Sequence, residues 1–310
     1  MTDATTTATT RARIAQWIES ASIRTVTLYI TFFGLVVLYL LPLAVAVVTS
    51  FKTDFAVLHT LPVVPPKIVE LTITNWLKAF NLLKNGLINS LTLTIPVAII
   101  SATMGSMTAY GLTQINWRGQ VAVLMLLIAA VFLPTQAAAV PLSKFWAIYV
   151  PLDQMLTPLW RLPLLEPYHG DLLALIITDI AFGIPICTIL FRAYYKGISN
   201  DMIEAATVDG ASWFSIYRRI ILPLSGPMFA VTLIYQFTQT WNSFLFPLII
   251  MYSANHPAAP VTLSLAGIGA SLGGIDYGLR MAGSLLTALP TIIVFLLFGE
   301  RFAEGVVGRT

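Results

Sequence analysis

The chain has 310 residues, of which 57% are apolar and only 10% are charged. Its mean hydropathy of +0.83 is far above what a soluble domain carries, so we expect the bilayer to be its solvent. The net charge is only +3, and the single cysteine, Cys187, excludes an intrachain disulfide and a multi-cysteine metal site.

Residues 1–24 are predicted to form a cytoplasmic tail and an interfacial helix. Met1 to Thr10 is rich in Thr and Ala without an apolar period, whereas Ile14, Trp17 and Ile18 recur at helical spacing. We therefore expect a disordered tail that leads into a helix lying on the membrane surface. The apolar run that follows is too long for a signal peptide and lacks a small-residue cleavage site, so it is expected to be retained.

Six apolar runs are long enough to cross a membrane, because a bilayer core of about 30 Å needs roughly 20 apolar residues in a helix. They cover residues 25–51, 87–112, 121–142, 172–194, 227–252 and 282–298. The runs are continuous rather than alternating, which favours a helical bundle over a β-barrel. The sequence thus predicts an all-α membrane protein with one six-helix domain, residues 25–305, and a short cytoplasmic tail, 306–310.

Two features bear on how these helices pack. Ser101, Gly105 and Ala109 stand four residues apart in the second run, which suits close approach by a helix of the same chain or of another subunit. Proline removes an amide donor and kinks a helix, and the resulting kinks could be mobile or static. Each run carries a proline near its interior or end: Pro42, Pro96, Pro134, Pro185, Pro247 and Pro290.

Between the fourth and fifth runs, residues 199–223 are predicted to form a helix-turn-helix elbow. Asp201 sits three residues before Glu204, the spacing of a capping box, so a short helix is expected to start there. Gly210 can take the positive φ that ends such a helix, and Ser212 can cap the next one. Pro223 is expected to force the chain out of the elbow before the fifth run.

The elbow reads Glu-Ala-Ala, three residues, Gly, nine residues, then Ile-x-Leu-Pro. This spacing resembles the signature of permease subunits of ATP-binding-cassette importers, and most of all the MalG-like subunits of the carbohydrate branch. The resemblance covers roughly residues 35–305. It includes Asn89-Ser90-Leu91 opening a helix, Ala109-Tyr110-Gly111 closing it, Trp241-Asn242-Ser243-Phe244-Leu245-Phe246-Pro247-Leu248 in the fifth run and Ala288-Leu289-Pro290 in the sixth.

In that family the elbow docks in a cleft of a separate ATPase subunit, where its glutamate meets a basic residue. The resemblance assigns this coupling role to Glu204, Ala205, Ala206, Asp209, Gly210, Ala211, Leu222 and Pro223. The chain departs from the family pattern at Ser199, where a proline is frequent, and at Ile203, where a second acidic residue is common. No Gly-Lys-Ser or Gly-Lys-Thr occurs, so the phosphate-cradling loop of an ATPase is missing.

The resemblance also implies the assembly and its location. ATP and Mg²⁺ would bind to two partner ATPase subunits, and this chain would be non-catalytic with no cofactor of its own. The other implied partners are a homologous MalF-like permease subunit, an extracytoplasmic sugar-binding protein, the sugar and membrane lipid, but no nucleic acid. Both termini and the elbow would lie on the cytoplasmic side of the inner membrane, which leaves ten basic residues inside and seven outside, a shallow positive-inside bias.

A candidate substrate pathway centres on Asp179, about seven residues into the fourth run. An acid at that depth is costly unless it faces protein or water, so it either lines a pathway or bonds to a polar group of an adjacent helix. Together with Asp179, five residues of the fifth run could line a wet cavity suited to a neutral sugar: Tyr235, Gln236, Gln239, Trp241 and Asn242. Trp241 and Asn242 belong to the shared family pattern, which favours a bracing role for both.

The predicted function is therefore the permease subunit of an ATP-driven importer of a mono- or disaccharide. An importer of another polyol and an ion-gradient-driven secondary transporter are the alternatives, although the latter favours several buried ionisable residues and internal repeats. A membrane-embedded enzyme or a DNA-binding helix-turn-helix is less favoured. His59, His169 and His256 fall in three separate connections and are expected to be solvent-exposed, and no metal site is predicted.

Overall fold

The computed structural model describes residues 23–115, 117–163, 165–268, 270–271 and 274–307. Most of the predicted tail and surface helix of residues 1–24, namely residues 1–22, lies outside the described residues, as do the last three residues of the chain. The remaining two residues of that prediction, Ile23 and Arg24, begin the first described helix. The chain divides into two units, Met1–Ile73 and Thr74–Thr310, so the predicted domain of residues 25–305 spans both.

The first unit consists of one long apolar helix and a short folded segment. Helix α2 (Ile23–Ser50) is followed by α3 (Asp54–His59) and the 3-10 turn η1 (Ile68–Glu70). Lys52 holds this segment together, because its buried Nζ donates to Thr60 Oγ1 (2.9 Å) and to the Leu61 carbonyl (2.8 Å). Burial lowers the pKa of Lys52, and the carboxylate of Glu70 opposes this shift.

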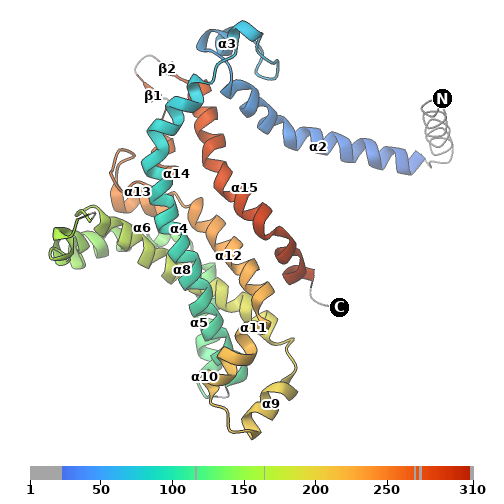
Figure 1. Cartoon of the computed structure of the whole chain (residues 1–310), viewed down its shortest axis with the longest axis vertical. Helices are drawn as coiled ribbons and strands as arrows, with labels where there is room; N and C mark the ends of the chain where they lie inside the picture. Colours follow the sequence, from blue (N-terminus) through green and yellow to red (C-terminus); the bar gives the residue numbers. More distant parts are fainter. Residues whose placement is uncertain (1–22, 116, 164, 269, 272–273, 308–310) are drawn as a thin grey trace. The chain divides into compact units, whose positions relative to one another are not determined.

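The second unit is built around α4 and α8, which pack against each other along much of their length (Figure 1). Helices α12 and α15 pack against α4, and α5 packs against α8. The helices packed in this unit are α4 (Thr74–Gln114), α5 (Gln120–Phe132), α8 (His169–Tyr195), α12 (Gly226–Trp241), α13 (Leu245–Met251), α14 (Val261–Gly267) and α15 (Tyr277–Val307). Strands β1 (Ala270–Ser271) and β2 (Gly274–Ile275) form a two-residue antiparallel ladder.

Further elements follow α5 and α8. Those after α5 are η2 (Thr135–Ala138), α6 (Ala139–Lys144), η3 (Phe145–Tyr149), α7 (Leu152–Met155) and η4 (Leu159–Arg161). Those after α8 are α9 (Asn200–Val208), α10 (Trp213–Ile216), η5 (Tyr217–Ile221) and α11 (Leu222–Leu224). Figure 1 shows α9 to α11 at one end of this unit and the β1–β2 ladder at the other.

Among the described residues, four helices (α2, α4, α8 and α15) are each long and apolar enough to cross a membrane. Two bent pairs bring the number to six if each counts as one span: Gln120–Phe132 with Thr135–Met155, bent by 94°, and Trp213–Leu224 with Gly226–Trp241, bent by 77°. The prediction of six spans therefore agrees with the structure only when bent spans are allowed.

The third and fifth runs are not the continuous helices that the sequence predicted. In the third run, Leu133 has an extended backbone (ψ 122°) because Pro134 disfavours the helical region for the residue before it. In the fifth run, α12 ends at Trp241 and α13 begins at Leu245; here the side chain of Asn242 donates to the carbonyl of Thr238 (2.9 Å).

Two expectations for the second run can also be compared with the structure. The Asn89-Ser90-Leu91 segment lies inside α4 rather than opening it, since that helix begins at Thr74. The small-residue face of Ser101, Gly105 and Ala109 is buried, and a Cβ added to Gly105 would lie 2.5 Å from the Cβ of Cys187 on α8. This face therefore serves packing within the chain.

Candidate functional site

The elbow begins at Ser199, the first residue of the predicted range, but its first helix starts before Asp201. Ser199 is the N-cap of α9, because its Oγ accepts a hydrogen bond from the amide of Asp201 (3.3 Å) and its backbone is extended (ψ 131°). The prediction that Asp201 opens the helix is therefore wrong. Asp201 instead lies in the first turn, where its carboxylate accepts from Ser199 Oγ (3.0 Å) and suits the positive end of the helix dipole.

The turn of the elbow has the backbone that the sequence predicted. Gly210 has φ +79°, the left-handed region that favours glycine. Its amide donates to the carbonyl of Thr207 (3.0 Å) and the amide of Ala211 donates to the carbonyl of Ala206 (3.0 Å), which is the Schellman arrangement at a helix end. Ser212 then caps α10 through its Oγ, which accepts from the amide of Ser215 (3.3 Å).

The chain leaves the elbow at Ser225, not at Pro223. Pro223 lies inside the continuous helical stretch Trp213–Leu224, just after the π-helical turn η5, and does not end it. The 77° bend falls between Leu224 and Gly226. The prediction that Pro223 ends the elbow is therefore wrong by two residues.

The residues assigned to ATPase docking form a largely exposed surface, here called the elbow surface. Glu204, Ala205, Asp209, Gly210 and Pro223 are exposed, whereas Ala206, Ala211 and Leu222 are half-buried. The carboxylate of Glu204 forms no hydrogen bond or ion pair with any part of the chain that the structure describes. It lines a groove of about 620 Å³ together with Thr113, Gln114, Ile203, Thr207, Val208 and Trp213.

Four buried hydroxyl groups, here called the hydroxyl cluster, tie the elbow to the membrane helices. Ser106 of α4 places its Oγ 2.6 Å from the hydroxyl of Tyr195 on α8 and 2.9 Å from that of Tyr217 in η5. Ser225 Oγ donates to the same Tyr195 hydroxyl (3.3 Å). The sequence did not predict this cluster, because its members come from four separate segments and carry no shared motif.

A second polar region is a cavity of about 370 Å³ between α5, α8 and α12, here called the polar cavity. Five of the six predicted pathway residues line it, namely Asp179, Tyr235, Gln236, Gln239 and Asn242. Trp241 does not line it: this side chain is buried and its Nε1 donates to the carbonyl of Thr287 on α15 (3.0 Å). Other lining residues include Thr135, Phe182, Gly183, Ser243, Phe244 and Phe246.

Asp179 occupies an unusual position in this cavity. Its side chain is only 6% exposed, and its Oδ2 has no hydrogen-bond partner in the described chain. The neighbouring amides bond to α12 itself, since Gln236 Nε2 donates to Thr240 Oγ1 (3.4 Å) and Gln239 Nε2 to the hydroxyl of Tyr235 (3.2 Å). A buried carboxylate oxygen therefore stands beside a polar cavity.

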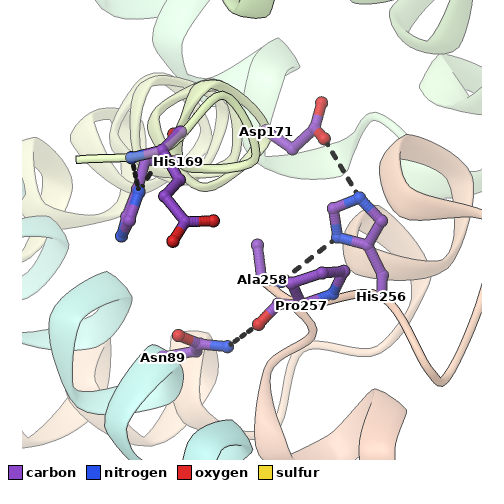
Figure 2. Close-up of polar contacts among 7 residues, drawn as sticks. Asn89, His169, Asp171, His256, Pro257 and Ala258 are labelled. Atoms are coloured by element: carbon purple, nitrogen blue, oxygen red, sulfur yellow. Dashed lines mark hydrogen bonds and ion pairs between the residues drawn. The ribbon is translucent and has the colours of Figure 1, made fainter. Parts of the chain in front are cut away.

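The loop before α14 is held to α8 through His256 and to α4 through Pro257 (Figure 2). The Nε2 of His256 lies 3.3 Å from Asp171 Oδ2 on α8, and its Nδ1 accepts from the amide of Ala258 (3.2 Å). Asn89 of α4 donates to the carbonyl of Pro257 (2.8 Å). The expectation of a solvent-exposed His256 is therefore wrong, because helix packing brings Asp171 to it. Within the described ranges, no group of three His, Cys, Asp or Glu side chains could hold a metal ion.

Comparisons with known proteins agree on one family. Residues 95–306 match the family described as the binding-protein-dependent transport system inner membrane component. The chain is 46% identical over 293 residues to the xylose/arabinose import permease protein XacI of Haloferax volcanii, covering 94% of this chain and 95% of that one. It is 30% identical over 279 residues to the glucose import system permease protein GlcU of Saccharolobus solfataricus, covering 87% and 89%.

The fold agrees with a solved transporter of low sequence identity. A crystal structure of a bacterial ABC transporter involved in the import of the acidic polysaccharide alginate aligns with a TM-score of 0.67 at 17% identity, covering 90% of this chain and 96% of that chain. The matched segment, residues 95–306, includes the elbow surface, the hydroxyl cluster and the polar cavity. The chain therefore belongs to the family of inner membrane components of binding-protein-dependent transport systems.

Proposed function

We propose that this chain is the permease subunit of an ATP-driven sugar importer and that the elbow surface receives force from a partner ATPase. The observation that carries the proposal is the elbow itself. An exposed carboxylate with no partner in the described chain, Glu204, stands on a short helix whose far end is closed by the positive φ of Gly210. The names of the relatives, which refer to xylose, arabinose and glucose, support sugar as the cargo class.

The hydroxyl cluster explains how such a surface would move the membrane helices. Ser106 and Tyr195 belong to α4 and α8, whereas Tyr217 and Ser225 belong to the elbow and its exit. Buried hydrogen bonds of this kind resist separation, since a buried polar group left without a partner costs about 1–3 kcal/mol. A displacement of the elbow is therefore expected to displace α4 and α8 with it.

The assembly that fits this mechanism has two ATPase subunits, a second homologous permease and an extracytoplasmic binding protein. ATP and Mg²⁺ would be bound by the ATPase subunits, and this chain would be non-catalytic, with both termini and the elbow on the cytoplasmic side. Docking alone does not drive transport, because a contact of equal strength in both states shifts no equilibrium. The ATPase pair must therefore interact with the elbow surface differently in its closed, ATP-bound state and in its open state.

The test is uptake of labelled xylose and arabinose by cells that contain the complete transporter. Glu204→Lys and Gly210→Asp should abolish uptake while the protein stays inserted in the membrane. Asp153→Lys, a charge reversal at an exposed position of α7, serves as the control and should leave uptake unchanged. Normal uptake by the Glu204→Lys variant would overturn the proposal.

A separate measurement tests the orientation. Val208 is exposed on α9, and Val208→Cys should react with a membrane-impermeant thiol reagent only when the cytoplasmic face is accessible. The native Cys187 is buried and should contribute little background. Labelling of intact cells from outside would place the elbow on the wrong side for an ATPase.

A further inference from the structure

The side chains that line the polar cavity favour some classes of cargo over others. Asp179 and Tyr235 are the only ionisable side chains among its lining residues, and no lysine or arginine is present there. A carboxylate accepts hydrogen bonds and donates none, so Asp179 Oδ2 calls for a donor that the described chain does not supply. A bound molecule with hydroxyl groups would supply one.

The rest of the lining suits a neutral polyhydroxylated ring. The amides of Gln239 and Asn242 can each donate and accept, which matches hydroxyl groups that do the same. Phe182 and Phe246, whose ring centroids lie 4.9 Å apart, and Phe244 offer apolar surface for the C–H faces of a sugar. The volume of about 370 Å³ lies near the lower limit of small-molecule sites, which span roughly 300–1,000 Å³.

An acidic sugar is disfavoured by the same residues. Its carboxylate would stand beside the buried carboxylate of Asp179, and like charges at close range repel each other. No cation among the lining residues would offset that repulsion.

From these observations we infer that the polar cavity is a cargo-contact site for neutral mono- or disaccharides, with Asp179 accepting hydrogen bonds from sugar hydroxyls and rejecting uronates. The inference rests on the proposed function and adds to it, because it places a cargo contact in this subunit. Gly183 contributes space: a Cβ there would lie 2.6 Å from Gln236 Nε2, so a side chain at this position would displace a residue that lines the cavity.

The first experiment measures sugar binding by the purified complete transporter without its binding protein, with xylose, arabinose and galacturonate as probes. Asp179→Asn should weaken binding of the neutral sugars by about ten- to hundredfold, the loss expected when a hydrogen bond to a charged group is removed. The same variant should lower the preference for neutral sugar over galacturonate by at least about tenfold, because the repelling charge is gone. Asp153→Asn should change neither value.

The preference ratio separates a contact role from a structural role. Misfolding would lower binding of neutral and acidic sugars alike, whereas removal of a sugar contact shifts the ratio between them. Unchanged binding of the neutral sugars in the Asp179→Asn variant would overturn the inference.

A second experiment does not depend on substituting Asp179. Ser243 lines the polar cavity and is half-buried, so Ser243→Cys should react with a small thiol reagent more slowly when xylose or arabinose is present. Ser253→Cys, at an exposed position after α13, should react at the same rate with and without sugar. Equal labelling of Ser243→Cys with and without either sugar would count against the site.

The two proposals can fail separately. Glu204→Lys should lose uptake but keep sugar-dependent protection of Ser243→Cys, because the elbow surface lies apart from the polar cavity. Normal uptake in the elbow variants together with protection in the cavity would reject the coupling proposal alone. The opposite result would reject the cargo-contact site alone: the elbow variants lose uptake, but sugar does not protect Ser243→Cys and Asp179→Asn binds sugar normally.

Discussion

The packing of α4 against α8 yields a quantitative prediction at Gly105. A Cβ at this position would lie 2.5 Å from the Cβ of Cys187 and 3.0 Å from both the carbonyl carbon of Cys187 and the amide nitrogen of Thr188. Carbon atoms attract best at about 3.5–4.0 Å, so Gly105→Ala must push the two helices apart by about 1 Å. Two of the three obstructing atoms are backbone, which leaves the helix little local means of relief.

The expected free energy follows from two opposing effects. Overpacking of a well-packed core costs about 1–3 kcal/mol. Replacing glycine by alanine inside a helix contributes up to about 1 kcal/mol in the stabilising direction. Gly111→Ala is the matched control, because it lies in the same helix and has nothing within 4 Å of the added Cβ. The two variants should therefore differ in stability by about 1–3 kcal/mol, with Gly105→Ala the less stable.

The assay is thermal unfolding of the purified protein in detergent, read as the midpoint at which monodisperse protein is lost. A difference of 1 kcal/mol corresponds to about 2–4 °C for a domain of this size. Cys187→Gly in the Gly105→Ala background removes the nearest obstructing atom and should recover part of the loss. If Gly105→Ala were as stable as Gly111→Ala, α4 and α8 would not approach each other as closely as the structure indicates.

Three further variants test the elbow, the hydroxyl cluster and the loop before α14. Gly210→Val should destabilise the protein by about 1–2 kcal/mol and Gly210→Asn by less, because the left-handed backbone penalises β-branched residues most; comparing their melting midpoints checks this. Tyr217→Phe should cost about 1 kcal/mol. Ser106→Ala should cost more, because it removes two hydrogen bonds and leaves the buried Tyr217 hydroxyl without this partner; a double-mutant cycle is the measurement. Ser90→Ala removes the acceptor of the buried Val261 amide (2.8 Å), so hydrogen exchange at that amide should accelerate and about 1–3 kcal/mol should be lost.

Local backbone chemistry makes the turn of the elbow predictable from its residues alone. The positive φ of Gly210 and the capping by Ser212 depend on residues within one turn of each other, so the residue types at those positions are sufficient. The start of α9 was misplaced because Ser199 and Asp201 are both competent caps. Only the extended backbone at Ser199 decides between them.

The apolar runs identified the membrane-spanning segments but not their continuity. A run of apolar residues indicates that the segment lies in the membrane, but it does not show whether the helix is continuous along the whole run. The break at Leu133 has a local cause in Pro134 that could have been recognised. The break between Trp241 and Leu245 also has a local cause, because Pro247 has no amide to donate to the carbonyl of Ser243 four residues earlier. That carbonyl accepts from Thr262 Oγ1 instead (2.7 Å).

The sequence alone determined that the chain is a helical membrane protein with a jointed elbow, because hydropathy and turn chemistry act over a few residues. Tertiary structure decided which polar groups meet. Ser106 and Tyr217 are 111 residues apart and share a hydrogen bond, and Asp179 of α8 lines the polar cavity together with glutamines of α12. Such meetings depend on how closely α4, α8 and α12 approach one another, and that spacing is a property of the packed helices rather than of any one segment.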